Sequence, residues 1–233
     1  SCLENNGYET PELNDKIYLH FRGFKKIENL DKFTGCKALW LDSNGFGKIE
    51  NLEPLLDLRC LYLSKNLITK IEGLDALQHL TILDLSNNRL SSIENLSGCP
   101  NLQTINLSYN ALTTVESVSH LKDCHSLNNI DITNNRLEAN EGFFDLFSEI
   151  PSLVALSING NEITKLANFR KRMIAKMSKL GYLDRPIDLQ ERTFAEAFIT
   201  GGAEAETAAR AQWKLDVEKK RQEELATFKA WQE

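Results

Sequence analysis

The sequence contains no apolar run near 18 residues long and no basic segment followed by an apolar one at its start. A membrane-spanning helix and a secretory signal peptide both need such runs, so we expect neither in this stretch and no membrane partner. The chain begins at Ser1 rather than at a methionine, which leaves a preceding targeting segment open.

Motifs that carry enzyme chemistry are also missing. There is no G-x-S-x-G, no glycine-rich phosphate loop, no H-E-x-x-H and no paired Cys/His spacing typical of metal sites. The four histidines are spread along the chain, and an acid–base pair needs two groups within hydrogen-bond reach. We therefore expect a protein that is not an enzyme and that binds no cofactor and no metal.

Cysteines are few, and they follow neither a disulfide framework nor a C-x-x-C spacing. They are Cys2, Cys36, Cys60, Cys99 and Cys124. An odd number without a framework indicates a reducing compartment, so we expect the protein in the cytoplasm. The formal net charge of -6 disfavours nonspecific binding to nucleic acid.

One motif is present seven times. Residues 80–96 read LTILDLSNNRLSSIENL, which fits L-x-x-L-x-L-x-x-N-x-L. The motif recurs at steps of 22 residues, which lengthen to 25 and 26 in the last two copies. The first residue of each L-x-L core gives the register: Ile17, Leu39, Leu61, Leu83, Ile105, Ile130 and Leu156. This period predicts an α/β leucine-rich-repeat solenoid with seven parallel strands along its concave side.

Composition changes along the chain predict four parts. They are an N-terminal capping segment, the solenoid, a C-terminal cap and a helical extension, at residues 1–14, 15–166, 167–187 and 188–233. In the extension, Asp188 and Glu191 have capping-box spacing, and Gly201-Gly202 predicts a break between two helices. The second helix is charged nearly all round in its middle, so we expect it to project, loosely attached.

An asparagine recurs five residues after each register residue, except in the first copy, where Arg22 stands. One side-chain amide can both donate to and accept from the unpaired backbone groups of a buried turn. We therefore expect a structural ladder, one amide per coil, rather than a ligand site. Its members are Asn44, Asn66, Asn88, Asn110, Asn135 and Asn161.

On the convex side, a glutamate recurs at the same period. The residues that follow these glutamates are of helix N-cap type: Asn29, Asn51, Gly73, Asn95 and Ser117. We expect a short helix or 3-10 turn to begin at each, and true α-helices in the two longer copies. The glutamate row is interpreted as a solvated edge, with a binding stripe as the alternative.

The cap is the most basic segment, because five cations lie between residues 170 and 179. We expect a helix with Asn168 as its N-cap and a solvated basic face. A nucleic-acid or anionic-lipid site is the alternative interpretation.

The concave face carries the side chains that best indicate function. Because strand residues alternate in direction, the residue after each register position points outward. Tyr18, Trp40 and Tyr62 stand on adjacent strands about 4.8 Å apart, and polar and acidic residues follow them. We expect partner binding there, with mutual packing of the rings as the alternative. The predicted binding residues are Tyr18, His20, Trp40, Asp42, Tyr62, Asp84, Asn106, Tyr109 and Asp131.

Several stretches resemble known proteins: TPELNDKIYLHFRGFKKIENL from Thr10, KALWLDSNGFGKIENL from Lys37, RCLYLSKNLITKIEGL from Arg59, and YLDRPI from Tyr182. They resemble the SDS22-like leucine-rich-repeat proteins. Within that subclass they are most similar to a ciliary family that helps to assemble axonemal dynein arms.

The resemblance implies a non-enzymatic factor that acts in the cytoplasm before dynein arms enter cilia or flagella. It implies axonemal dynein chains, chaperones or other assembly factors as partners, and we expect a monomer. Two alternatives remain, an SDS22-type regulatory subunit of protein phosphatase 1 and a U2A′-like ribonucleoprotein module. The helices after the cap disfavour the first, and the lack of a basic concave surface disfavours direct RNA binding.

Overall fold

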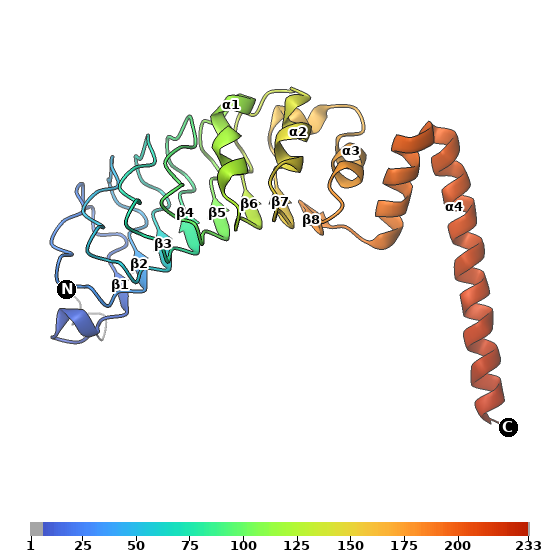
Figure 1. Cartoon of the computed structure of the whole chain (residues 1–233), viewed down its shortest axis with the longest axis horizontal. Coiled ribbons are helices and arrows are strands. Elements are labelled where there is room, and N and C mark those ends of the chain that lie inside the picture. Colours follow the sequence, from blue (N-terminus) through green and yellow to red (C-terminus); the bar gives the residue numbers. More distant parts are fainter. Residues whose placement is uncertain (1–6, 233) are drawn as a thin grey trace.

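The computed structural model describes residues 7–232, which form a curved solenoid and a helical arm that points away from it (Figure 1). The first six residues of the predicted N-terminal capping segment, including Cys2, lie outside the described residues. One sheet of nine strands lines the concave side, with the strands in sequence order. These are β1 (Lys16–Tyr18), β2 (Ala38–Trp40), β3 (Cys60–Tyr62), β4 (Ile82–Asp84), β5 (Thr104–Asn106), β6 (Asn129–Asp131), β7 (Ala155–Ser157), β8 (Tyr182–Leu183) and β9 (Arg185–Pro186).

The seven predicted strands are confirmed in register. Each register residue sits mid-strand and pairs with the next in parallel, from Ile17 opposite Leu39 through to Ile130 opposite Leu156. All are buried, because the inward side of every strand faces the coil interior. The sequence did not predict β8 and β9. In β8, Leu183 pairs with Leu156, so the cap continues the sheet for one more strand before β9 turns back antiparallel.

The ladder asparagines bond from coil to coil. The Asn88 amide nitrogen donates to Leu63 O at 2.9 Å in the previous coil and to Leu85 O at 3.0 Å in its own. Its oxygen accepts from the Ile68 N–H at 3.0 Å. Asn66, Asn110, Asn135 and Asn161 repeat this pattern and are buried. Each amide therefore satisfies backbone groups of two successive turns.

The convex side differs from the expectation in its first four coils, where the described residues contain no helix. Asn29, Asn51, Gly73 and Asn95 adopt left-handed φ between 58° and 68°, which is not N-cap geometry. The Asn51 and Asn95 amides instead donate to Ile27 O at 2.6 Å and to Ile71 O at 2.7 Å, one coil back. Left-handed residues, two of which bond to the coil before, thus replace the expected helix starts.

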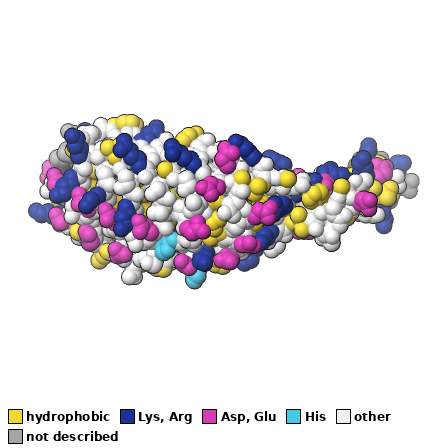
Figure 2. All heavy atoms as spheres, turned by 90° about the horizontal axis from the view of Figure 1, so that it is seen from above, with side chains coloured by type: hydrophobic (Ala, Val, Ile, Leu, Met, Phe, Trp, Pro, Cys, Tyr) yellow, Lys and Arg dark blue, Asp and Glu magenta, His cyan; other side chains and the backbone are white. Residues whose placement is uncertain are grey.

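Helices cover the convex side of the longer coils. They are α1 (Val115–Val118), η3 (Ser119–Asp123), α2 (Gly142–Ser148) and η4 (Glu162–Lys165), of which η3 and η4 are 3-10 helices. The expectation of α-helices holds for α2, which buries Phe143 and Phe147, but the preceding copy is half 3-10. Thr114, not Ser117, is the N-cap of α1. Basic and acidic side chains are interspersed over this side (Figure 2).

Both ends of the apolar core are covered. At the N-terminus, η2 (Pro11–Leu13) packs so closely that a Cβ on Gly35 would lie 2.1 Å from the Glu12 carbonyl oxygen. At the other end, α3 (Phe169–Lys176) buries Phe169, Met173 and Ile174. Asn168 does not cap α3 through its side chain, because its backbone is left-handed with φ 55°. Asn168 is the N-cap residue of α3, as predicted, but it supplies no side-chain hydrogen bond to the helix.

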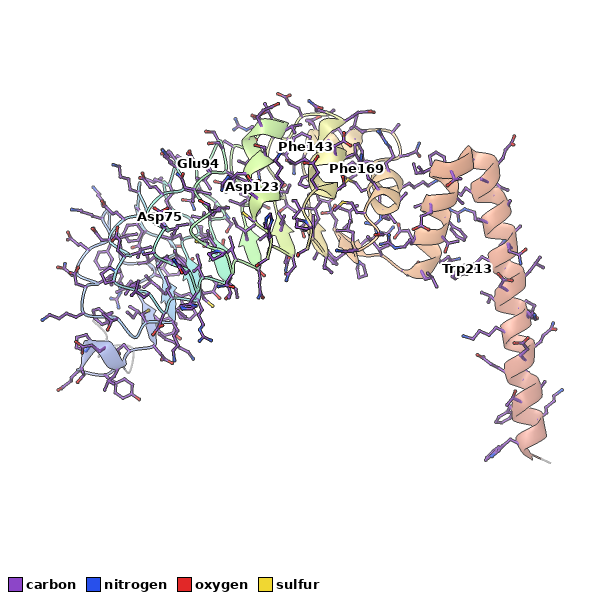
Figure 3. All side chains as sticks on the ribbon, in the orientation of Figure 1. Asp75, Glu94, Asp123, Phe143, Phe169 and Trp213 are labelled. Carbon is purple, nitrogen blue, oxygen red and sulfur yellow. The ribbon has the colours of Figure 1, made fainter. Side chains whose placement is uncertain are left out.

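The arm is α4 (Leu189–Gln232), which kinks at Gly201 and Gly202, as the sequence predicts. Asp188 caps its start by accepting from the Glu191 N–H at 2.7 Å. Beyond the kink, Trp213 meets Phe194 edge-on, with ring centroids 6.1 Å apart (Figure 3). The first turns after the kink are therefore anchored, and only the charged part beyond them projects.

We expect Asn88→Ala to lower the free energy of unfolding by about 1–3 kcal/mol, because it leaves buried backbone groups unpaired. Urea melts would measure the loss. Asn101→Ala is the matched control, since Asn101 is exposed and donates only to Gln78 O. A change within about 0.5 kcal/mol is expected there. Equal stability of the two variants would contradict a structural role for the ladder.

We expect the rate of amide hydrogen exchange to differ between the anchored and the projecting parts of the arm. Residues around Glu206 and Trp213 should exchange slowly, because side chains from α3 and the first half of α4 hold them. Residues 215–229 should exchange fast, since their side chains are exposed. Uniformly slow exchange would show that the far half packs on another surface.

Candidate protein-binding site

Three aromatic rings form a continuous stack on the outward side of β1 to β3. Tyr18 and Trp40 are stacked with centroids 4.5 Å apart, and Trp40 and Tyr62 follow at 5.1 Å. The parallel register places them side by side, because Tyr18 pairs with Trp40 and Trp40 with Tyr62. All three are half-buried. The rings therefore pack on one another and still present an accessible surface.

The same row becomes polar at β4 and stays so. Asp84, Asn106 and Asp131 each accept, through one side-chain oxygen, a hydrogen bond from the N–H two residues on. Asp42, in the neighbouring row, accepts from both the N–H and the hydroxyl of Ser64 at 3.1 and 2.9 Å. The acidic side chains are thus held in fixed positions on the concave face.

Burial affects the acid–base behaviour of this surface. It raises the pKa of Asp84, and the nearby carboxylates of Asp42 and Asp131 raise it further, against the lowering effect of Ser86. Burial is also the main cause of a raised pKa at Tyr62. The fold therefore disfavours the ionised forms of Asp84 and Tyr62.

The other predicted binding residues lie apart from the ring stack or at its margin. His20 meets the Tyr18 ring edge-on with centroids 6.2 Å apart. Tyr109 belongs to the fifth coil and is 55% exposed, so it does not join the stack. Phe21, which the sequence analysis missed, is 74% exposed and contacts His20 at the first coil.

Phe21 and Tyr109 share an unusual backbone position, four residues after the register residue. Both have φ 56°, in the left-handed region that the equivalent residues of the other coils also adopt, namely Ser43, Lys65, Asn87, Asn134 and Gly160. Asparagine and glycine tolerate this conformation, whereas bulky residues rarely do. Phe21 and Tyr109 therefore present exposed rings from a backbone conformation that disfavours bulky residues.

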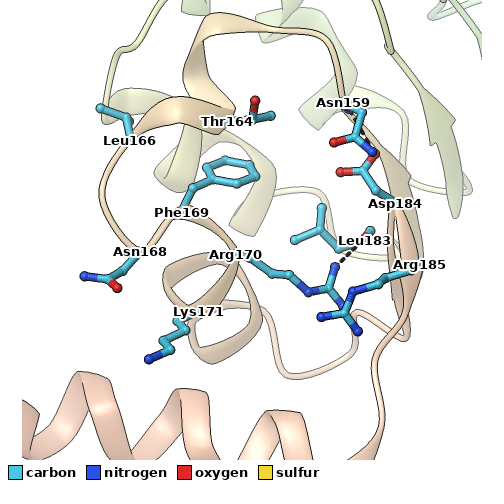
Figure 4. A pocket seen from close by; sticks show the side chains of 10 residues that line it. All are labelled: Asn159, Thr164, Leu166, Asn168, Phe169, Arg170, Lys171, Leu183, Asp184 and Arg185. Atoms are coloured by element: carbon cyan, nitrogen blue, oxygen red, sulfur yellow. Dashed lines mark hydrogen bonds between the residues drawn. The ribbon is translucent and has the colours of Figure 1, made fainter. Parts of the chain in front are cut away.

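A hollow at the cap is lined by both polar and apolar side chains and has a volume of about 570 Å³ (Figure 4). Its cations already have partners. Arg170 forms a two-pronged pair with Glu191 at 2.7 Å, and Lys171 pairs with Glu206. These bonds hold the pKa of both glutamates below the usual range. We interpret this hollow as part of the cap rather than as an anion site.

The rest of the basic segment is also paired. Arg172 bonds Glu141 at 3.0 Å, Lys176 bonds Asp145, and Lys179 donates to Pro151 O at 3.1 Å. The expected solvated basic face is therefore a junction of ion pairs and a hydrogen bond between the cap and the sixth coil.

Two buried cysteines are candidate reactive groups, and the described residues include candidate metal ligands. Burial raises the pKa of Cys99 to about 12 and that of Cys124 to about 11, so both stay protonated and unreactive at neutral pH. Among residues 7–232, no group of three or more His, Cys, Asp or Glu side chains is placed to hold a metal ion. None of the described helices combines the length and apolar character needed to cross a bilayer.

We expect Tyr109→Asn to raise the free energy of unfolding by roughly 0.5–1 kcal/mol, because asparagine relieves the left-handed backbone. Asn134→Tyr, the reverse change at the equivalent position, should lower it by a similar amount. Urea melts of the two variants would measure both. Destabilisation by Tyr109→Asn would show that the ring contributes to the fold.

Comparisons with known proteins agree with this architecture. A family model described as "Leucine Rich repeats (2 copies)" matches residues 56–98 and 78–122. An internalin from Listeria monocytogenes has a similar fold, with a TM-score of 0.62, 22% identity, and coverage of 80% of this chain and 53% of that one. A leucine-rich-repeat protein of Leptospira interrogans gives a TM-score of 0.63 at 23% identity, covering 79% and 48%.

Curated relatives are more similar in sequence. Dynein axonemal assembly factor 1 of Mus musculus is 59% identical over 94% of this chain and 35% of its own length. The Homo sapiens protein of that name is 58% identical over 94% and 30%. Leucine-rich repeat-containing protein ODA7 of Chlamydomonas reinhardtii is 51% identical over 94% and 51%. This chain therefore spans between about a third and a half of these relatives. It is a leucine-rich-repeat protein homologous to the dynein axonemal assembly factors.

Proposed function

We propose that the protein is a non-enzymatic scaffold for the assembly of axonemal dynein arms. The observation that carries this proposal is the 59% identity, over 94% of the chain, to relatives named for that role. It favours dynein assembly over the phosphatase-regulatory and ribonucleoprotein alternatives. Assembly in the cytoplasm, before the arms reach the cilium or flagellum, is part of the proposal.

The concave face is the proposed binding surface for dynein chains, chaperones or other assembly factors. Trp and Tyr side chains dominate the binding energy of many interfaces, and Trp40 lies at the centre of the ring stack. The strands beneath are held by parallel pairing and by the asparagine ladder, so the surface is preorganised. A monomer with one such face is the simplest arrangement.

Trp40→Ala tests the surface. It should weaken the complex by roughly 2 kcal/mol or more if the ring stack is a hot spot. Its two stacking contacts are each worth about 0.5–1.5 kcal/mol, so the variant should melt lower but stay folded near room temperature. Affinity purification from ciliated cells, followed by mass spectrometry, would measure the dynein chains recovered with the wild type and with Trp40→Ala. Circular dichroism on the same preparations would measure their folding and melting.

Trp231→Ala is the matched control. Trp231 is 81% exposed at the far end of the arm, so the same substitution there removes a ring outside the proposed site. Recovery of dynein chains should be unchanged. Loss with Trp231→Ala but not with Trp40→Ala would move the site to the arm. Recovery of phosphatase catalytic subunits in place of dynein chains would overturn the proposed function itself.

A further inference from the structure

The acidic residues of the concave face can be compared with a neutral residue in the same row. Asn106 stands between Asp84 and Asp131 in register, and all three side chains perform the same task. Their Oδ1 atoms accept the N–H two residues on at 2.9, 3.1 and 2.9 Å in chain order. Because the amide of Asn106 serves the turn as the carboxylates do, the fold does not require the negative charges.

Those charges are also uncompensated inside the protein. Within the described part of the chain, no lysine or arginine forms an ion pair with Asp42, Asp84 or Asp131. The carboxylates near the cap, by contrast, have cationic partners: Glu191 pairs with two arginines, and Glu206 pairs with a lysine and an arginine. A half-buried carboxylate without a cation costs stability at neutral pH, and the raised pKa of Asp84 reflects this cost.

The ring stack ends where the acidic stretch begins. One face of the Tyr62 ring lies on Trp40 at an interplanar angle of 15°. On the next strand, the register partner of Tyr62 is Asp84, about 4.8 Å away across the sheet. A guanidinium group can stack on an aromatic face and pair with a carboxylate at the same time.

We propose that the concave face docks a basic, extended segment of a partner protein, with an arginine side chain between Tyr62 and Asp84 and a second cation at Asp131. Charge complementarity selects this occupant, because it supplies the cations that the fold itself does not. Asp84 and Asp131 are two strands apart, about 10 Å. An extended peptide in the polyproline II conformation advances about 9 Å in three residues and returns its side chains to the same face at that spacing. The segment is therefore of the Arg-x-x-Arg type. This inference rests on the proposed function only in using the same surface.

Purified protein and a synthetic probe test the inference. The probe is a fluorescein-labelled peptide with arginine at every third position among glycine and serine, and binding is followed by fluorescence anisotropy. The variant is Asp84→Asn with Asp131→Asn, which keeps the backbone bonds as Asn106 does. The control is Glu50→Gln with Glu72→Gln, which makes the same change in net charge on the convex side.

We expect the concave double variant to bind the probe at least tenfold more weakly, and the convex control to change binding less than twofold. Replacing the arginines of the probe by neutral citrulline should remove binding to the wild type. The melting temperature of the concave variant should stay equal or rise, because two uncompensated charges have been removed. No saturable binding by the wild type, or equal losses in the two variants, would overturn the inference.

The outcomes separate this inference from the proposed function. If probe binding depends on Asp84 and Asp131 but affinity purification recovers no dynein chains, the inference is supported and the proposed function is rejected. If Trp40→Ala loses the dynein chains but probe binding is unchanged by Asp84→Asn with Asp131→Asn, the proposed function stands and the inference is overturned. A partner that binds the rings without basic residues would account for that second result.

Discussion

The structure depends on one side-chain amide in each coil after the first. A solenoid of short strands must turn sharply after every strand, and each turn leaves backbone groups that water cannot reach. Asn88 and its equivalents satisfy these groups in their own coil and in the coil before. Since no coil can bury its leucines alone, the same bonds that close one turn also fix the distance to its neighbour.

This rigidity gives the concave face its properties. Outward side chains are presented in rows by parallel pairing, so rings on adjacent strands must stack and carboxylates on nearby strands must repel. A surface of this kind changes little on binding, and its affinity depends on which side chains stand in the rows. The change from aromatic to acidic between Tyr62 and Asp84 is therefore the feature that should determine partner choice.

The ring stack could be predicted from the sequence because the 22-residue period sets both the strand and the side on which a residue points. The degree of burial could not, since it depends on how closely the rings of Tyr18 and Trp40 approach. Tyr109 was predicted to lie on the same surface because it is close to the outward-facing residues of its own coil. It lies apart from the ring stack because it belongs to the fifth coil and the stack to the first three. Its left-handed backbone was visible only in the structure.

The repeat, the strand register, the asparagine ladder and the break at Gly201-Gly202 could all be predicted from the order of the amino acids. Each of these is local or strictly periodic, so residue type and spacing suffice. Packing in three dimensions, by contrast, makes Asn51 and Asn95 bridge coils instead of starting helices. It also determines that the basic cap meets acidic partners, such as Glu191 for Arg170, and that β8 and β9 extend the sheet. Such contacts join segments far apart in the chain, and the packing of whole elements, not a local pattern, brings them together.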